Sequence, residues 1–523
     1  MYRTDFLIKN IVIIHILLFN FSCSNGSKDN QTDEENNNGK DKVVLQIDKN
    51  QVYQTIDNFG ASDAWSCQFI GQWPMEKREK IADLLFSQDF KNDGSAVGIG
   101  LSLWRFNIGA GSAGQGEASE ISDEWRRAES FLQSNGTYDW EKQKGQVWFA
   151  NAAKSGGVQK LLAFTNSPPV HFTKNNKAYS SDGQSNLEAD KYPDFANYLA
   201  DVIEGLGSMD LKVNYLSPFN EPQWDWSDAT QEGCPFWNNQ ISDFVKIMNT
   251  ELVNRGLEVS IDVGEAGKID YLFEEADKVG RSNQITDFFS ESSGNYIGNL
   301  SQVSNVISGH SYFTTSPYST AVNKRTSLAN AINNITDLNF WMSEYCVLGD
   351  NAGELDGNGR DLSINSGLYV ARVIHNDLVV ANASAWHWWL AVSPYDYKDG
   401  LIYVDKQKDD GQFYESKILW ALGNFSRFIR PGYQRINVTK EENIPNNNLL
   451  CSGYKNPDSG GVVLVIINSD IKNITISLEN GDQKLIVSKA YITSDDKDLD
   501  VFEIDNSAVE IPARSIITFL INS

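Results

Sequence analysis

The sequence predicts a (β/α)8 barrel joined to an antiparallel β-sandwich. Strand-like runs alternate with helical stretches through most of the chain, which is the pattern of βα units around a parallel sheet. Beyond about Gly423, short strands follow one another with Asn, Asp and Gly turns and no helical pattern between them. The chain has 523 residues, more than one compact core usually holds, so a second domain is expected.

The predicted barrel strands are apolar, β-branched or aromatic runs. They cover residues 59–65, 100–109, 160–169, 213–222, 258–267, 305–313, 339–347 and 383–391. The clearest helical stretches between them are 75–88, 193–207 and 238–256. The second of these begins at Pro193 and ends at Gly207, and the third ends at Gly256, which are good start and stop signals. We therefore predict a barrel over residues 59–425.

The predicted sandwich strands lie near the C-terminus, at residues 461–468, 473–478, 485–492 and 508–521. The segment 42–56, ahead of the first barrel strand, also has a strand pattern. We expect one or more strands within 43–58 to join a C-terminal sandwich over 426–523, which would tie the two ends of the chain together.

The N-terminus has the pattern of an export signal. A short apolar run, IVIIHILLFNFSC, is too short to cross a bilayer and ends at Ser22-Cys23. Residues 1–22 resemble a bacterial lipoprotein signal, with cleavage before Cys23 and lipidation of that cysteine. The polar, acidic segment 23–42 resembles the surface-export tether of Bacteroidetes lipoproteins. We expect an exported protein with a lipid anchor in the outer membrane, exposed on the cell surface. A periplasmic or secreted protein with an ordinary cleaved signal is the alternative.

Charge and cysteine content limit the possible partners. The net charge is −25, from 44 basic and 69 acidic residues, which argues against binding to nucleic acid or to an anionic membrane surface.

Beyond Cys23, the cysteines are Cys67, Cys234, Cys346 and Cys451, and none has the spacing of a metal site. Free buried thiols are expected, although pairing stays open in an exported protein. No metal or cofactor is predicted, and the sequence leaves the oligomeric state open.

Two glutamates stand at the predicted ends of barrel strands, where such barrels place their active sites. Asn220-Glu221 ends the fourth strand and Ser343-Glu344 ends the seventh. Two carboxylates at one site suit glycoside hydrolysis, in which one protonates the leaving oxygen and the other attacks the anomeric carbon or stabilises its charge. Two carboxylates that share one active site cannot both ionise easily. We therefore expect the carboxyl that acts as the acid/base to have a raised pKa. The sequence has no GxSxG elbow, HExxH zinc motif or P-loop.

Five motifs in matching order make residues 43–523 similar to glycoside hydrolase family 30, a family of retaining (β/α)8 glycosidases. They are FGASDAWS, LWRFNIGAGS, SPFNEPQWDW, GHSYF and FWMSEY. The C-terminal run IPARSIITFLI resembles the last sandwich strand of that family. The resemblance implies that Glu221 is the general acid/base and Glu344 the nucleophile.

Four polar residues near these glutamates are expected to bind the substrate or the nucleophile. Asn220 should bind the hydroxyl next to the anomeric carbon, and Arg105 should hold the nucleophile ionised. His310 and Tyr312 should donate hydrogen bonds to the nucleophile or the sugar. The alternatives are a structural ion pair for Arg105 and a satisfied core histidine for His310.

The remaining candidates lie on the first and last barrel strands. Trp388 is expected to stack on the apolar face of the sugar, with Trp386 as the second candidate, while Trp386 or Trp389 packs into the barrel wall. Asp63 and Trp65 match the first motif and are expected to line the same subsite.

The expected substrate is a β-linked polysaccharide or oligosaccharide. Trp224 and Trp226 lie in a loop that suggests an extended polymer-binding cleft, although they could only pack that loop against the barrel. The same loop resembles the branch of family 30 that cleaves β-1,6-galactan, so we predict an endo-β-1,6-galactanase. A β-1,6-glucanase is the next alternative, followed by an exo-acting β-glycosidase on glucose, fucose or xylose units. The strand 8 loop lacks an arginine for a glucuronic acid branch, which disfavours glucuronoxylanase.

Two further hypotheses belong to other classes. A surface glycan-binding lipoprotein on an inactive barrel would be favoured by loss of a catalytic glutamate, but both are present. An aldolase or metallohydrolase would need a strand-end lysine or a His/Asp cluster, and the sequence shows neither.

Overall fold

The computed structural model describes residues 42–440 and 447–522. The predicted signal 1–22, the lipidation candidate Cys23 and all but the last residue of the tether 23–42 lie outside the described residues. None of the helices within the described residues is long and apolar enough to cross a membrane.

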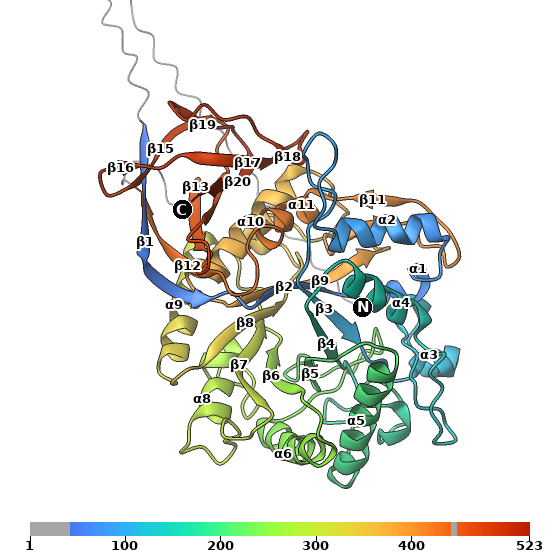
Figure 1. Ribbon diagram of the computed structural model, residues 1–523. Coiled ribbons are helices and arrows are strands. Elements are labelled where there is room, and N and C mark those ends of the chain that lie inside the picture. The colour runs from blue at the N-terminus through green and yellow to red at the C-terminus, as the bar shows by residue number, and fades with distance from the viewer. Residues whose placement is uncertain (1–41, 441–446, 523) are drawn as a thin grey trace, which may run out of the picture. The chain divides into compact units, whose positions relative to one another are not determined.

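A closed parallel barrel occupies the middle of the chain (Figure 1), which confirms the predicted fold class. Within residues 42–440, its strands in spatial order are β2 (Asn58–Ser62), β3 (Leu103–Asn107), β4 (Lys160–Phe164), β5 (Tyr215–Ser217), β6 (Ser260–Ala266), β7 (Val303–His310), β8 (Asn339–Glu344) and β9 (Ala385–Ser393). The barrel closes because β9 pairs with both β8 and β2. Two strands outside the prediction, β10 (Gly400–Val404) and β11 (Phe413–Glu415), extend the sheet beyond β9.

The helices between these strands begin and end close to their sequence signals. The longer ones are α2 (Met75–Phe86), α4 (Lys144–Ser155), α5 (Tyr192–Ser208), α6 (Asn238–Arg255), α9 (Tyr318–Asn333), α10 (Ile364–Val379) and α11 (Lys417–Ser426). The shorter turns are α1 (Cys67–Ile70), α3 (Ser112–Gln115), α7 (Asp270–Phe273), α8 (Gln284–Phe289) and the 3₁₀ turns η1 (Gly116–Ser119), η2 (Glu124–Arg126), η3 (Val170–Phe172), η4 (Ala189–Lys191) and η5 (Asn351–Gly353). Pro193 lies in the first turn of α5, and Gly256 caps α6 in the left-handed conformation, with φ 66°. Helix α2 is shorter than predicted because Ser87 has extended dihedrals.

The second sheet contains the C-terminal strands and β1 (Val43–Thr55). The C-terminal strands are β12 (Gln434–Lys440), β13 (Leu449–Lys455), β14 (Val462–Asn468), β15 (Ile474–Asn480), β16 (Gln483–Lys484), β17 (Val487–Thr493), β18 (Asp498–Val501), β19 (Val509–Ile511) and β20 (Ser515–Ile521). Their order is β16-β15-β1-β12-β13-β14-β20-β17-β18, with β19 on β15. Figure 1 shows β1 beside β12 and β15. The pairing of β1 with β15 is parallel, unlike the other pairs of this sheet.

Two details differ from the predicted strands. The run 508–521 forms two strands, because Arg514 takes a left-handed φ of 51° and breaks the run between β19 and β20. Strands β12, β13, β16 and β18 were not predicted from the sequence.

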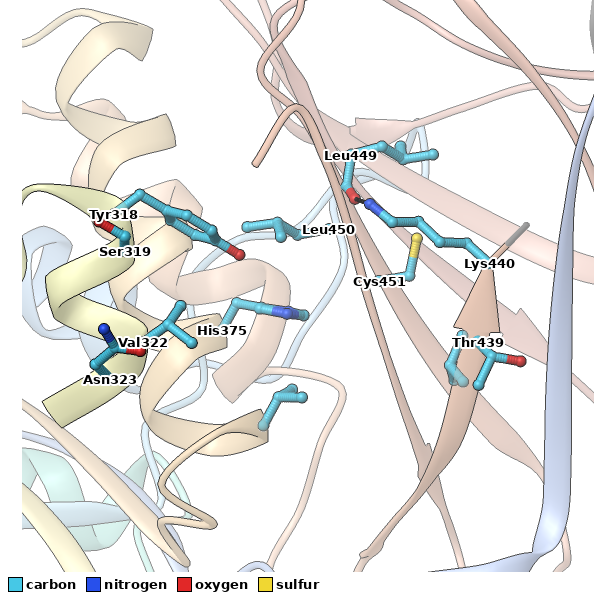
Figure 2. Close-up of a pocket in the computed structure, with 12 residues that line it drawn as sticks. Tyr318, Ser319, Val322, Asn323, His375, Thr439, Lys440, Leu449, Leu450 and Cys451 are labelled. Carbon is cyan, nitrogen blue, oxygen red and sulfur yellow. Dashed lines mark hydrogen bonds between the residues drawn. The ribbon is translucent and has the colours of Figure 1, made fainter. Parts of the chain in front are cut away.

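Buried polar contacts join the sandwich to α11 of the barrel. Asn424 Nδ2 donates to Thr493 Oγ1 at 2.7 Å, and Thr518 Oγ1 donates to the Asn424 carbonyl at 2.7 Å. Elsewhere, a cavity of about 430 Å³ lies between helices α9 and α10 and strands β12 and β13. Figure 2 shows residues that line it. His375 faces it, and burial lowers the pKa of that imidazole to about 3. None of its described lining residues is an acid, so it lacks the carboxylates of a glycosidase site.

Candidate active site

The barrel brings Glu221 and Glu344 together at the carboxyl ends of its strands. Glu344 is the last residue of β8, and Glu221 follows β5 by a few residues. Glu221 has a left-handed φ of 45°, and its N–H donates to the Glu265 carbonyl at 2.8 Å. Such a backbone is costly for a non-glycine residue and is concentrated at functional sites. The tight turn at Glu221 aims its carboxyl into the barrel mouth.

Glu344 is surrounded by groups that favour its carboxylate. Arg105 Nη1 donates to Glu344 Oε2 at 2.9 Å, and Tyr312 Oη donates to Oε1 at 3.0 Å. Burial raises the pKa of Glu344, while the charges of His310 and Arg105 oppose that rise. A raised pKa at the predicted nucleophile was not expected from the sequence.

His310, at the end of β7, connects three carboxylates. Its Nδ1 lies 3.0 Å from Glu221 Oε1 and 3.6 Å from Glu344 Oε1. Its Nε2 lies 2.7 Å from Glu265 Oε2. Burial alone would lower the pKa of His310, but the carboxylates of Glu344, Glu221 and Glu265 raise it to about 10. With this pKa, the ring would be an imidazolium at neutral pH and would donate from both nitrogens.

The two catalytic candidates are close neighbours. Ligand-type atoms of Glu221, His310 and Glu344 all lie within 4.8 Å of one another. This spacing also occurs in metal sites, but both nitrogens of His310 already face carboxylates at hydrogen-bond distance. The group is therefore explained by hydrogen bonds and charge, without a metal ion.

A cavity of about 380 Å³ opens over the glutamates. It is lined by Asn220, Glu221, Trp224, Trp226, Gln231, Tyr312, Phe313, Glu344, Leu348 and Trp389. Asn220 Nδ2 donates to Asn166 Oδ1 at 3.1 Å, which fixes the amide. Its Oδ1 is buried and has no partner among the described residues, so it can accept from a ligand hydroxyl.

The tryptophans of β9 differ in their access to the cavity. Trp388, expected to stack on the sugar, is fully buried and donates through Nε1 to the Asp399 carbonyl at 2.7 Å. Trp386 is also buried, stacks on Trp388 and donates to Asp377 at 2.9 Å. Neither is among the residues that line the cavity, whereas Trp389 is. The difference follows from strand geometry, since residues 386 and 388 share the face that packs on the surrounding helices.

Asp63 and Trp65 lie outside the cavity lining. Asp63 accepts from Asn107 N at 2.8 Å, and burial raises the pKa of its carboxyl to about 8. Trp65 packs edge-on against Trp389, with ring centroids 5.3 Å apart. In these positions, Asp63 supports the backbone, and Trp65 supports the tryptophan that lines the cavity.

Glu265, near the end of β6, is the main residue that the sequence analysis missed. It accepts from Arg105, His310 and Ser343 below the cavity. Its position at the end of a barrel strand, like those of Glu221 and Glu344, was the signal that could have identified it. Phe313 and Gln231 also line the cavity and were not predicted.

Comparisons with known proteins agree with this geometry. Residues 42–403 match O-Glycosyl hydrolase family 30, and residues 432–519 match the Glycosyl hydrolase family 30 beta sandwich domain. An endo-beta-1,6-galactanase of Hypocrea rufa is 24% identical over 409 residues, covering 75% of this chain and 76% of the relative.

Solved structures extend the likeness. A conserved exported protein from Bacteroides fragilis is 36% identical, with a TM-score of 0.85 over 91% of this chain and 100% of that chain. An endo-beta1,6-glucanase shares the fold, with 17% identity and a TM-score of 0.65 over 92% of this chain and 94% of that chain.

Proposed function

Because the chain belongs to O-glycosyl hydrolase family 30, and so is a glycoside hydrolase, we propose that it is a retaining endo-β-1,6-galactanase. The observation that carries the mechanism is the spacing of Glu221 and Glu344, which have carboxylate oxygens within 4.8 Å. Retaining enzymes hold their carboxyls about 5–5.5 Å apart, whereas inverting enzymes need about 6.5–9.5 Å to admit a water molecule.

In the proposed first step, Glu344 attacks the anomeric carbon and forms a glycosyl ester. The bond to the leaving oxygen breaks as Glu221 gives that oxygen its proton. In the second step, Glu221 takes a proton from water, the hydroxide oxygen attacks the anomeric carbon, and Glu344 leaves as a carboxylate. Arg105 and Tyr312 stabilise the negative charge of the Glu344 carboxylate before it attacks and after it leaves.

The lining of the cavity supports a neutral sugar. Its described residues include neither Lys nor Arg, so no fixed cation is available to pair with a uronic acid. Trp224, Trp226 and Trp389 offer apolar faces for the CH groups of sugar rings. The similarity to an endo-beta-1,6-galactanase over most of both chains favours β-1,6-galactan over other neutral polymers.

On β-1,6-galactan, the first products are expected to be oligosaccharides rather than galactose. Several aromatic contacts would hold an internal bond of the polymer over the glutamates, and remote contacts can contribute to the transition state. Time-resolved sizing of products from β-1,6-galactan, β-1,6-glucan and xylan tests this. Galactose as the first and only product would indicate exo action. Hydrolysis of β-1,6-glucan alone would support the alternative function, a β-1,6-glucanase.

Trp224→Ala is expected to reduce turnover of long galactan about ten-fold or more, with a smaller effect on an aryl galactoside. Trp224 is only partly buried and contacts Phe313 edge-on, so its removal takes away a stacking surface beside the cavity. Trp226 is a poorer test because its Nε1 donates to the Glu221 carbonyl at 3.0 Å. Equal losses on both substrates would assign Trp224 to loop packing.

We also propose that the mature protein is exported and lipid-anchored through Cys23. The sequence around Ser22-Cys23 supports this, and the relative from Bacteroides fragilis is described as exported. Cys23→Ser is expected to move the protein from the membrane fraction to the soluble fraction, because the acyl chains would be lost. Fractionation with immunodetection measures this, and a variant that stays membrane-bound would contradict the anchor.

A further inference from the structure

A buried pair of acids on β6 lies behind the catalytic carboxylates and lines no described cavity. Asp262 and Glu265 are each 1% exposed. Glu265 Oε2 lies 2.7 Å from His310 Nε2, 3.1 Å from Ser343 Oγ and 3.4 Å from Arg105 Nη2. Asp262 Oδ1 accepts from the hydroxyl of Ser308.

The remaining oxygens of the pair indicate a shared proton. Asp262 Oδ2 and Glu265 Oε1 are buried and have no donor among the described residues, yet the two carboxyls are in hydrogen-bonding contact. Two carboxyl oxygens can bond only if one carries a proton. Burial and the charge of Glu265 raise the pKa of Asp262 well above its usual range. Burial also acts on Glu265, but Arg105 and His310 lower its pKa to about 2. Asp262 is therefore the neutral acid and Glu265 the anion.

His310 is the group on which this anion acts. The charged and titratable groups that act on it are Glu265 on β6, Tyr312 just beyond β7, Glu344 on β8, His387 on β9 and Glu221 after β5. Asp262 on β6 and Arg105 on β3 contact Glu265. Glu265 lies on the opposite side of the ring from Glu221, because the two acids face different ring nitrogens.

We propose that Glu265 is a positioning residue that keeps His310 an imidazolium between Glu221 and Glu344, and that Asp262 donates the proton that holds Glu265 in place. This rests on the proposed double displacement. During glycosylation, negative charge leaves Glu344 as it forms the ester and appears on Glu221 as it gives up its proton. His310 lies 3.6 Å from one carboxylate and 3.0 Å from the other, so a single fixed cation faces the charge before and after the step. No group has to reorient to follow the charge.

The test compares two isosteric changes on one strand. In Glu265→Gln the ring loses its anion, so His310 should become neutral at neutral pH. In Asp262→Asn the amide N–H can donate to Glu265 as the protonated carboxyl does, so His310 should stay charged. Imidazole ¹⁵N NMR of the resting protein reads the charge directly, and loss of a signal in His310→Asn assigns it. His375 and His387 are internal references, since burial lowers the pKa of each to about 3.

We expect His310 in the wild-type protein to remain doubly protonated through pH 8. Glu265→Gln should lower its pKa by more than three units, to below 7, and reduce turnover at pH 7 by ten-fold or more, with a smaller change in KM. Because the ring loses its charge as pH rises through the lowered pKa, the variant should recover activity relative to wild type at lower pH. Glu265→Asp, which keeps the anion, should retain more activity than Glu265→Gln at pH 7.

Three results would overturn the proposal. They are a wild-type His310 that titrates between pH 5 and 8, a charged His310 in Glu265→Gln, and an Asp262→Asn pH profile displaced as far as that of Glu265→Gln. If Glu265→Gln does not fold, the wild-type titration still decides. A wild-type protein that hydrolyses none of the tested glycans would contradict the proposed function while leaving the NMR result interpretable.

Discussion

Glu344→Gln is expected to reduce turnover by at least about 10³-fold while the fold persists, because the amide cannot form the glycosyl ester. The amide is nearly isosteric with the carboxyl, and its single oxygen can still accept from either Arg105 or Tyr312, whereas its NH2 group cannot accept from the other. Initial rates on galactan and on an aryl galactoside measure the loss, and circular dichroism checks the fold. Activity near the wild-type level would show that Glu344 is not the nucleophile.

Azide separates the roles of the two glutamates. In Glu344→Gly, azide can enter the vacated space and attack the anomeric carbon directly, which gives a galactosyl azide of inverted configuration. In Glu221→Gly, Glu344 still forms the ester with a good leaving group, and azide then displaces it to give the retained configuration. Proton NMR of the azide products distinguishes the two, and exchanged outcomes would exchange the assignments.

Arg325→Leu is expected to destabilise the protein by about 3–5 kcal/mol, because it leaves the buried charge of Asp377 without its partner. Arg325 Nε donates to Asp377 Oδ1 at 2.6 Å, and both side chains are fully buried. Asp377 also accepts from Ser311 and from Trp386, next to the strand ends that carry the site. Urea denaturation followed by tryptophan fluorescence measures the effect.

Two controls belong to that experiment. Adding Asp377→Asn to Arg325→Leu should recover part of the stability, because the amide oxygen can still accept from Ser311 and Trp386 without a buried charge. Lys80→Met removes the partner of Glu76 in an exposed pair on α2 and should change stability little. A loss in Arg325→Leu as small as that in Lys80→Met would show that the buried pair is not important for stability.

The sequence was sufficient to predict the barrel, because its strands are apolar runs. Polar residues follow several of these runs at the strand end where the site lies. Glu221 and Glu344 were identified in this way, and the structure brings them together. Glu265 also lies near a strand end, but its role depends on tertiary contacts. Nothing in the run Ser260–Ala266 shows that His310 and Arg105, from other strands, surround one of its acids.

The β9 tryptophans show a second limit. Strand alternation predicts that residues 386 and 388 share a face, and they do stack. It does not tell which face that is, because both faces of a barrel strand are buried, one in the barrel and one under helices. The partners that decide are Asp377 on α10 for Trp386 and the cavity for Trp389, and both depend on distant segments.

Strand β1 also determines the order in which the two sheets can form during synthesis of the chain. Its Tyr53 bonds to Asn437, 384 residues later in the chain. At a synthesis rate of about 5–20 residues per second, this strand waits roughly 20–80 s for its neighbour to emerge. The barrel strands are complete before β12 exists, so the sheet that contains β1 can close only after the barrel has been made. A chain interrupted before β12 would carry β1 as a 13-residue ribbon with unpaired edges, which is a template for aggregation.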